Sequence, residues 1–166
     1  APMPEKIDFS KVSFLIVDTN PLSAQLVRDI LGMLDVTAVR TATNIERAQN
    51  VLRRDGVDVV ITEHALGDES GVDLIDWIRN GADSPDRMTP VIMLTANSAQ
   101  NYVMTARDKG VSEFLAKPFT VEGLYRRLVS VISRPRSFVN IDDYFGPDCR
   151  RRQVPYEGPE RRSTDG

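Results

Sequence analysis

Residues 57–63 read Val57-Asp58-Val59-Val60-Ile61-Thr62-Glu63, a short, almost wholly apolar run that ends on an acid. Such a run is typical of a central strand in a parallel sheet, because helices cover both faces of that sheet. Three further apolar runs also end on a polar side chain. These are residues 12–17 before Asp18, 91–94 before Thr95 and 114–116 before Lys117. Carboxyl ends of parallel strands open on one edge of the sheet, where ligands bind. The sequence therefore predicts one pocket that contains Asp18, Glu63, Thr95 and Lys117.

Helical segments separate these strands along the chain. Asn20 and Pro21 supply an N-cap and a first-turn proline, and apolar residues then follow at helical spacing. Further helices are predicted after Asn44, over residues 71–79 and 98–109, and after Thr120, with further strands over 36–42 and 111–116. Five βα units in succession predict an α/β domain over residues 7–133, with a doubly wound parallel sheet. Residues 134–166 are rich in Pro, Arg, Gly and Asp, and they predict an irregular C-terminal extension.

Composition narrows the class of protein. The 166 residues carry a formal net charge of −3, which does not mark the whole chain as a nucleic-acid binder, and no helix-turn-helix pattern indicates DNA binding. Cys149 is the single cysteine, so no internal disulfide can form and a reducing compartment is expected. No apolar stretch approaches the roughly 20 residues of a membrane span, and residues 1–4 lack the features of a signal peptide. We expect a cytoplasmic protein that does not enter membranes.

Four segments resemble the CheY-like receiver domains of bacterial response regulators in two-component signal transduction. They are Phe14-Leu15-Ile16-Val17-Asp18, Asp58-Val59-Val60-Ile61-Thr62-Glu63, Val91-Ile92-Met93-Leu94-Thr95-Ala96 and Phe114-Leu115-Ala116-Lys117-Pro118-Phe119. The resemblance implies a flavodoxin-like fold with strand order 2-1-3-4-5. It also implies a cis peptide bond between Lys117 and Pro118.

The resemblance further implies a phosphoacceptor position and a Mg²⁺ site. Receivers of this family take a phosphoryl group on an aspartate at the end of strand three, and the equivalent residue here is Glu63. In the family, that aspartate and an acidic pair after strand one hold Mg²⁺, whose preferred ligands are oxygens. The equivalents of the pair are Asp18 and Thr19, so only Asp18 and Glu63 remain as acidic ligands of a weakened Mg²⁺ site.

Three more residues match positions that contact or sense the phosphoryl group in the family. The hydroxyl of Thr95 and the ammonium group of Lys117 match the groups that stabilise phosphoryl oxygens. Phe114 matches the aromatic residue whose movement is coupled to that hydroxyl, although a phenylalanine buried in the core fits this position equally well. Thr95, Lys117 and Phe114 are therefore the equivalents of the switch residues.

Glu63 and Thr19 both depart from the family pattern in ways that remove phosphoryl-transfer machinery. In-line attack depends on placement to well under ~1 Å, and glutamate carries its carboxylate one methylene further than aspartate. We interpret the chain as a pseudo-receiver that is not phosphorylated in the usual way, in which Glu63 reaches Lys117 and holds an active-like arrangement. Such a protein would be a signalling adaptor rather than an enzyme, with a kinase, motor or regulatory protein as its partner. A phosphorylation-competent receiver in a phosphorelay is an alternative.

The extension contains a repeated motif in which an aromatic residue precedes Gly-Pro, an acid and paired arginines. Arginine forks bind phosphates and stack on bases, and the tail loosely resembles the arginine-rich extensions of CheY-like cyclic-di-GMP effectors. A second alternative is therefore a cyclic-dinucleotide effector. Its candidate ligand-binding residues are Arg150, Arg151, Arg152, Arg161 and Arg162. The extension could instead be a soluble tail or an arm that docks on its own or a neighbouring domain through Phe138, Ile141, Tyr144 and Phe145.

Overall fold

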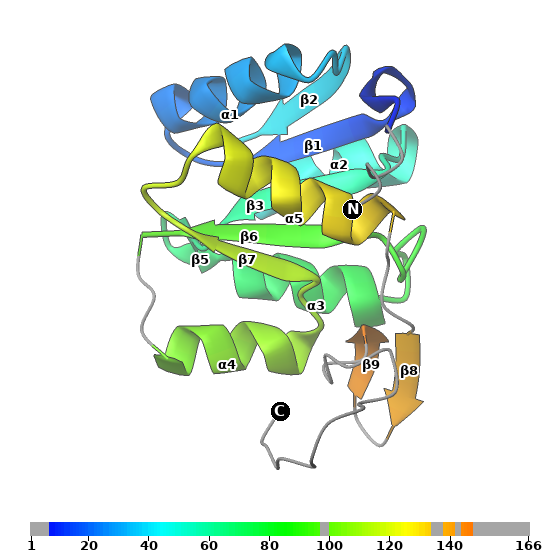
Figure 1. Ribbon diagram of the computed structural model, residues 1–166. Coiled ribbons are helices and arrows are strands. Elements are labelled where there is room, and N and C mark those ends of the chain that lie inside the picture. The colour runs from blue at the N-terminus through cyan, green and yellow to red at the C-terminus, as the bar shows by residue number, and fades with distance from the viewer. Residues whose placement is uncertain (1–6, 97–99, 134–137, 142–143, 148–166) are drawn as a thin grey trace, which may run out of the picture.

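The computed structural model describes residues 7–96, 100–133, 138–141 and 144–147 (Figure 1). Its main sheet contains five parallel strands in the order β2-β1-β3-β6-β7, which confirms the predicted order 2-1-3-4-5. The strands are β1 (Ser13–Val17), β2 (Ala38–Ala42), β3 (Val59–Glu63), β6 (Val91–Thr95) and β7 (Glu113–Ala116). All but one residue of β3 are buried, as expected for the central strand.

Five helices cover the two faces of this sheet (Figure 1). They are α1 (Pro21–Met33), α2 (Ile45–Arg54), α3 (Gly71–Asn80), α4 (Gln100–Lys109) and α5 (Val121–Ser133). Buried side chains of α2, α3 and α4 pack with one face of the strands, and those of α1 and α5 pack with the other. The predicted doubly wound, flavodoxin-like fold is confirmed. None of the helices in the described ranges combines the length and apolarity needed to cross a bilayer.

The connection between β3 and α3 contains regular structure of its own. It contains a small antiparallel pair, β4 (Ala65–Leu66) and β5 (Glu69–Ser70), with Gly67 at a positive φ of 69° in the turn. Glu69 accepts a hydrogen bond from the backbone N–H of Ile45 at 3.2 Å. Because Ile45 is the first residue of α2, this contact joins the connection after β3 to the neighbouring helix.

The prediction of an irregular extension is wrong for two segments of it. Strands β8 (Phe138–Ile141) and β9 (Tyr144–Pro147) pair antiparallel and lie beside α3 and α4 (Figure 1). The rings of Phe138 and Phe145 are 5.4 Å apart, so the aromatic residues of the extension pack against each other. These described strands fit the alternative of an arm docked on its own domain. The domain boundary at residue 134 stays a prediction.

Arg79, in the last turn of α3, is buried where this hairpin meets the domain. Its guanidinium donates hydrogen bonds to the backbone oxygens of Gly110 at 2.9 Å and of Arg87 and Thr89 at 2.7 Å each. The guanidinium also lies over the ring of Phe138, 5.0 Å from its centroid. Burial lowers the pKa of Arg79 to about 10, so the side chain remains a cation at neutral pH.

Candidate functional site at the carboxyl edge of the sheet

The structure places the four predicted pocket residues at the same edge of the sheet. Asp18 directly follows β1, Glu63 ends β3, Thr95 ends β6 and Lys117 directly follows β7. The parallel register aligns these ends, because Glu63 lies opposite Leu94 and Thr95 lies opposite Ala116. Residues from distant parts of the sequence therefore share one edge, as the strand pattern predicts.

An ion pair between Glu63 and Lys117 lies at this edge. One carboxylate oxygen of Glu63 accepts a hydrogen bond from Nζ of Lys117, and the other accepts from the backbone N–H of His64 at 3.1 Å. Lys117 Nζ also donates to the hydroxyl of Ser23, in the first turn of α1, at 3.0 Å. The exposed fraction is 11% for the Glu63 side chain and 24% for Lys117, so the pair is largely shielded from water.

Sequence analysis missed Ser23 as a member of the site. The signal available was its position in the first turn of the helix that follows Asp18, which places it at the carboxyl edge. A serine at that position is also common as a capping or surface residue, so the sequence alone did not distinguish it.

Asp18, Thr19 and Thr95 have different surroundings at this edge. The carboxylate of Asp18 is buried and accepts a hydrogen bond from the backbone N–H of Asn20 at 2.9 Å, whereas Thr19 is exposed. Thr95 is buried, and its carbonyl oxygen accepts from the backbone N–H of Lys117 at 2.9 Å. The Lys117–Pro118 peptide bond is cis, as the resemblance implies. No ion pair joins Asp18 to Lys117 in the part of the chain that the structure describes.

These donors do not fit the Mg²⁺ ion of the receiver family. Thr19 offers a hydroxyl in place of a carboxylate, and the ammonium group of Lys117 already contacts the carboxylate of Glu63. A divalent cation at Glu63 would have to lie beside that ammonium group or displace it. Within the described ranges, no group of three or more His, Cys, Asp or Glu side chains could hold a metal ion. The donor set therefore does not support the predicted site of Asp18 and Glu63.

Phe114 packs into the core in the structure. Its half-buried ring contacts the buried cluster formed with α2, α3 and α4, and its carbonyl oxygen accepts a hydrogen bond from Nε of Arg127 at 2.6 Å. The packing is that of a core residue, and a switch role for Phe114 stays a prediction.

Gly71 brings the start of α3 against the backbone of Glu63. Its N–H donates to the carbonyl oxygen of His64 at 2.8 Å. A Cβ at Gly71 would lie 2.5 Å from the carbonyl oxygen of Glu63 and 3.1 Å from the hydroxyl of Thr62. Because the first of these contacts is with backbone, an added methyl group could not be accommodated without a shift of β3 or α3.

We therefore expect Gly71→Ala to lower the free energy of unfolding by about 1–3 kcal/mol and to disturb the environment of Glu63. Urea denaturation measures the first effect, and backbone amide NMR shifts of Glu63 and His64 measure the second. The control is Gly32→Ala in α1, where a Cβ would meet no atom within 4 Å. That substitution should be neutral or stabilise by up to about 1 kcal/mol. Equal effects of the two substitutions would contradict the predicted clash.

The five arginines named above as candidate nucleotide-binding residues all lie outside the described residues, so a site for a cyclic dinucleotide stays a prediction. Ser98 and Ala99, at the predicted start of α4, also lie outside the described residues, and the structure gives the helix from Gln100.

The fold and the composition of this edge define a receiver-type α/β signalling domain. The family model for the response regulator receiver domain matches residues 14–129, and the chain belongs to this family. It is 33% identical to the response regulator protein PilR of Pseudomonas aeruginosa over 128 residues, which are 77% of this chain and 27% of PilR. The chain thus spans about a quarter of the length of PilR.

Two further similarities cover whole receivers. The chain is 28% identical to the chemotaxis protein CheY-3 of Vibrio cholerae over 130 residues, which are 78% of this chain and 98% of CheY-3. It also superposes on the receiver domain of the sensor histidine kinase PA1611 of P. aeruginosa with a TM-score of 0.65 and 26% identity, covering 74% of this chain and 98% of that domain. That structure has a magnesium ion coordinated in its active-site cleft.

Proposed function

We propose that this chain is a receiver that signals without aspartyl phosphorylation and acts as an adaptor for a protein partner. The observation that carries the proposal is the ion pair between Glu63 and Lys117. The resemblance assigns Lys117 to the position that contacts a phosphoryl oxygen, and here the chain's own carboxylate engages it. The pocket thus has an anion against its lysine before any phosphoryl group arrives.

The chemistry of the pocket supports the same conclusion. An incoming phosphoryl group would need Glu63 to leave Lys117 and to attack in line, and a displacement of about 1 Å costs on the order of a hundredfold in rate. The missing acid at Thr19 removes a ligand for the cation that would neutralise the charge developing on the phosphoryl oxygens. Glu63 imitates a phosphorylated acceptor only in part, because it supplies one negative charge where a phosphoryl group carries up to two. The resulting state is an active-like arrangement set by the sequence.

A protein partner is supported by the surface of α1. Leu22, Leu26 and Met33 are 80%, 54% and 67% exposed and share one face of this helix. Exposed apolar side chains that gather on one face mark protein interaction sites. The hydrogen bond from Lys117 to Ser23 joins the same helix to the pocket, so the ion pair and the apolar face lie on connected elements.

We expect no covalent modification when the full chain is incubated with acetyl phosphate and Mg²⁺ and then measured by intact mass. We also expect beryllofluoride, a phosphoryl mimic, to leave the amide NMR spectrum unchanged, because Lys117 is already engaged. Glu63→Gln serves as the control, since it removes the carboxylate but keeps the size of the side chain. A stable gain of one phosphoryl group that disappears in Glu63→Gln would refute the proposal.

A further inference from the structure

Strand β9 is one of two copies of a short motif in the extension. It reads Tyr144-Phe145-Gly146-Pro147, and the sequence continues with an acid and arginines. The later segment Tyr156-Glu157-Gly158-Pro159 is again followed by an acid and arginines. The tyrosine, glycine and proline recur at the same spacing, and only the second position differs. The contacts of the first copy therefore show what a segment needs in order to dock there.

The glycine of the first copy is required by close packing. A Cβ at Gly146 would lie 2.9 Å from Cα of Gly110 and 2.6 Å from the hydroxyl oxygen of Tyr144. Gly110 has a positive φ of 102°, and a Cβ there would lie 3.1 Å from the carbonyl oxygen of Phe145. Gly110 in the turn after α4 and Gly146 in the hairpin therefore pack directly against each other. A larger residue at Gly146 would force them apart.

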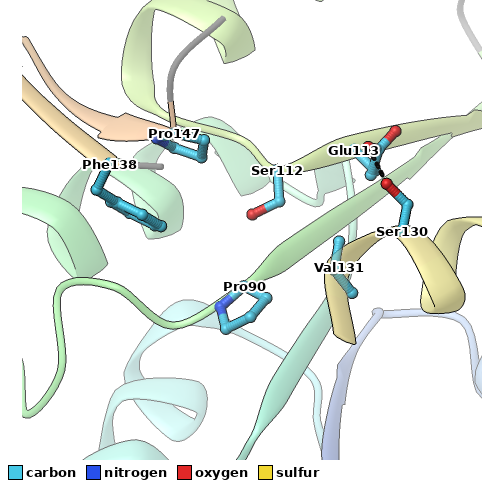
Figure 2. A pocket seen from close by; sticks show the side chains of 7 residues that line it. All are labelled: Pro90, Ser112, Glu113, Ser130, Val131, Phe138 and Pro147. Atoms are coloured by element: carbon cyan, nitrogen blue, oxygen red, sulfur yellow. Dashed lines mark hydrogen bonds between the residues drawn. The ribbon is translucent and has the colours of Figure 1, made fainter. Parts of the chain in front are cut away.

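The tyrosine and the proline also have defined contacts. The hydroxyl of Tyr144 donates to the carbonyl oxygen of Pro147 at 2.7 Å, which closes the segment on itself. Pro147 is buried, and it faces Phe138 and Pro90 across a small cavity of about 30 Å³ (Figure 2). Ser112 lies on the same cavity. The tyrosine and the proline recur in the second copy as Tyr156 and Pro159.

The second position of the motif faces a cation. The guanidinium of Arg87 lies 3.5 Å from the centroid of the Phe145 ring, and its Nε donates to the carbonyl oxygen of Arg79 at 2.9 Å. A guanidinium group stacks on an aromatic face and also pairs with a carboxylate. The substitution of Glu157 for Phe145 therefore keeps a favourable partner for Arg87. The second copy thus keeps the tyrosine, the glycine and the proline, and at its second position it offers Arg87 a carboxylate in place of the Phe145 ring, without that ring's contact with Phe138.

We propose that residues 156–159 dock in the site of β9 as an alternative to residues 144–147, pairing with the same strand β8. The connection after β8 then lengthens from residues 142–143 to residues 142–155. Because closing a longer loop costs more entropy, the equilibrium favours docking of the first copy by roughly 20-fold. The exchange changes which arginines follow the docked segment, from Arg150–Arg152 to Arg161 and Arg162. This inference goes beyond the proposed function and does not depend on it.

The test uses hydrogen exchange of the full chain and three variants, Gly146→Val, Gly158→Val and the double variant. We expect Gly158→Val to match the unsubstituted chain. Gly146→Val should lower the protection of the β8 amides by about 20-fold or less and give protection to the amides of residues 156–159. The double variant should lose the remaining protection of β8. If Gly146→Val alone loses as much β8 protection as the double variant, the proposal is overturned.

Two controls keep the result interpretable. Protection of β1 and β3, measured in the same experiment, reports whether each variant has kept its fold. If either valine variant fails to fold, Tyr144→Ala, Tyr156→Ala and their double variant replace the series, because they remove the hydroxyl contact without adding bulk. Protection of β8 in Gly146→Val should be the same at low and high protein concentration. Protection that increases with concentration would place the second copy on another molecule and overturn docking within one chain.

Discussion

Replacing Arg79 with methionine is expected to lower the free energy of unfolding by about 3–5 kcal/mol, because it leaves three backbone carbonyl oxygens without their hydrogen-bond donor. The guanidinium of Arg79 joins three carbonyl oxygens from two connections, those of Gly110 after α4 and of Arg87 and Thr89 before β6. Methionine fills much of the volume but donates no hydrogen bond. Each buried acceptor left without a donor costs about 1–3 kcal/mol.

Urea denaturation followed by circular dichroism measures this loss. The matched control is Arg126→Met in α5, where the arginine is 69% exposed and forms an i,i+4 ion pair with Glu122 at 2.9 Å. That change should stay within about 0.5 kcal/mol, as is usual for exposed pairs. Arg79→Lys should recover only part of the loss, because one ammonium group cannot reproduce the planar fork. A loss below about 1 kcal/mol for Arg79→Met would show that water replaces the guanidinium without difficulty.

The main sheet was predictable because each strand and helix carries its own periodicity. The apolar run of β3 and the helical spacing of the apolar residues of α2 are local signals, and the cap residues Asn20 and Asn44 mark where helices begin. Right-handed connection of successive βα units then leaves few arrangements of the sheet. The strand ends fixed the edge at which Asp18, Glu63 and Lys117 would lie.

The hairpin and the burial of Arg79 were not predictable in this way. Strands β8 and β9 have only four residues each, and β9 contains glycine and proline, which are typical of a turn rather than a strand. Their partners are Arg79 and Arg87, which lie far away in the sequence. A basic residue in the last turn of a helix is ordinarily a surface residue that favours the helix dipole, and only the tertiary contacts bury Arg79.

The pocket shows the same division between local and tertiary information. That Glu63 could reach Lys117 follows from the length of its side chain, and the ion pair in the structure agrees with that prediction. The contact from Lys117 to Ser23 depends on how α1 packs on the sheet, which periodicity does not specify. The replacement of a carboxylate by the hydroxyl of Thr19 is visible directly in the sequence.

Restoring both departures, with Thr19→Asp and Glu63→Asp, is expected to create a phosphoacceptor. Aspartate at position 63 is one methylene shorter, so it withdraws from Lys117 and leaves the ammonium group for an incoming phosphoryl oxygen. Aspartate at position 19 lies beside the buried carboxylate of Asp18 and restores the acidic pair that the resemblance implies for Mg²⁺. With acetyl phosphate and Mg²⁺, the double variant should gain one phosphoryl group by intact mass, at least about a hundredfold faster than the unsubstituted chain.

The single variants separate the two effects. Thr19→Asp alone should remain unmodified, because the carboxylate of Glu63 stays on Lys117. Glu63→Asp alone should react more slowly than the double variant, because one acidic ligand is still missing. Glu63→Asn combined with Thr19→Asp removes the nucleophilic carboxylate and should abolish the uptake of the phosphoryl group. If the double variant takes up no phosphoryl group while remaining folded, Thr19 and Glu63 do not explain the absence of phosphorylation, and the distinction from a working receiver must lie elsewhere in the pocket.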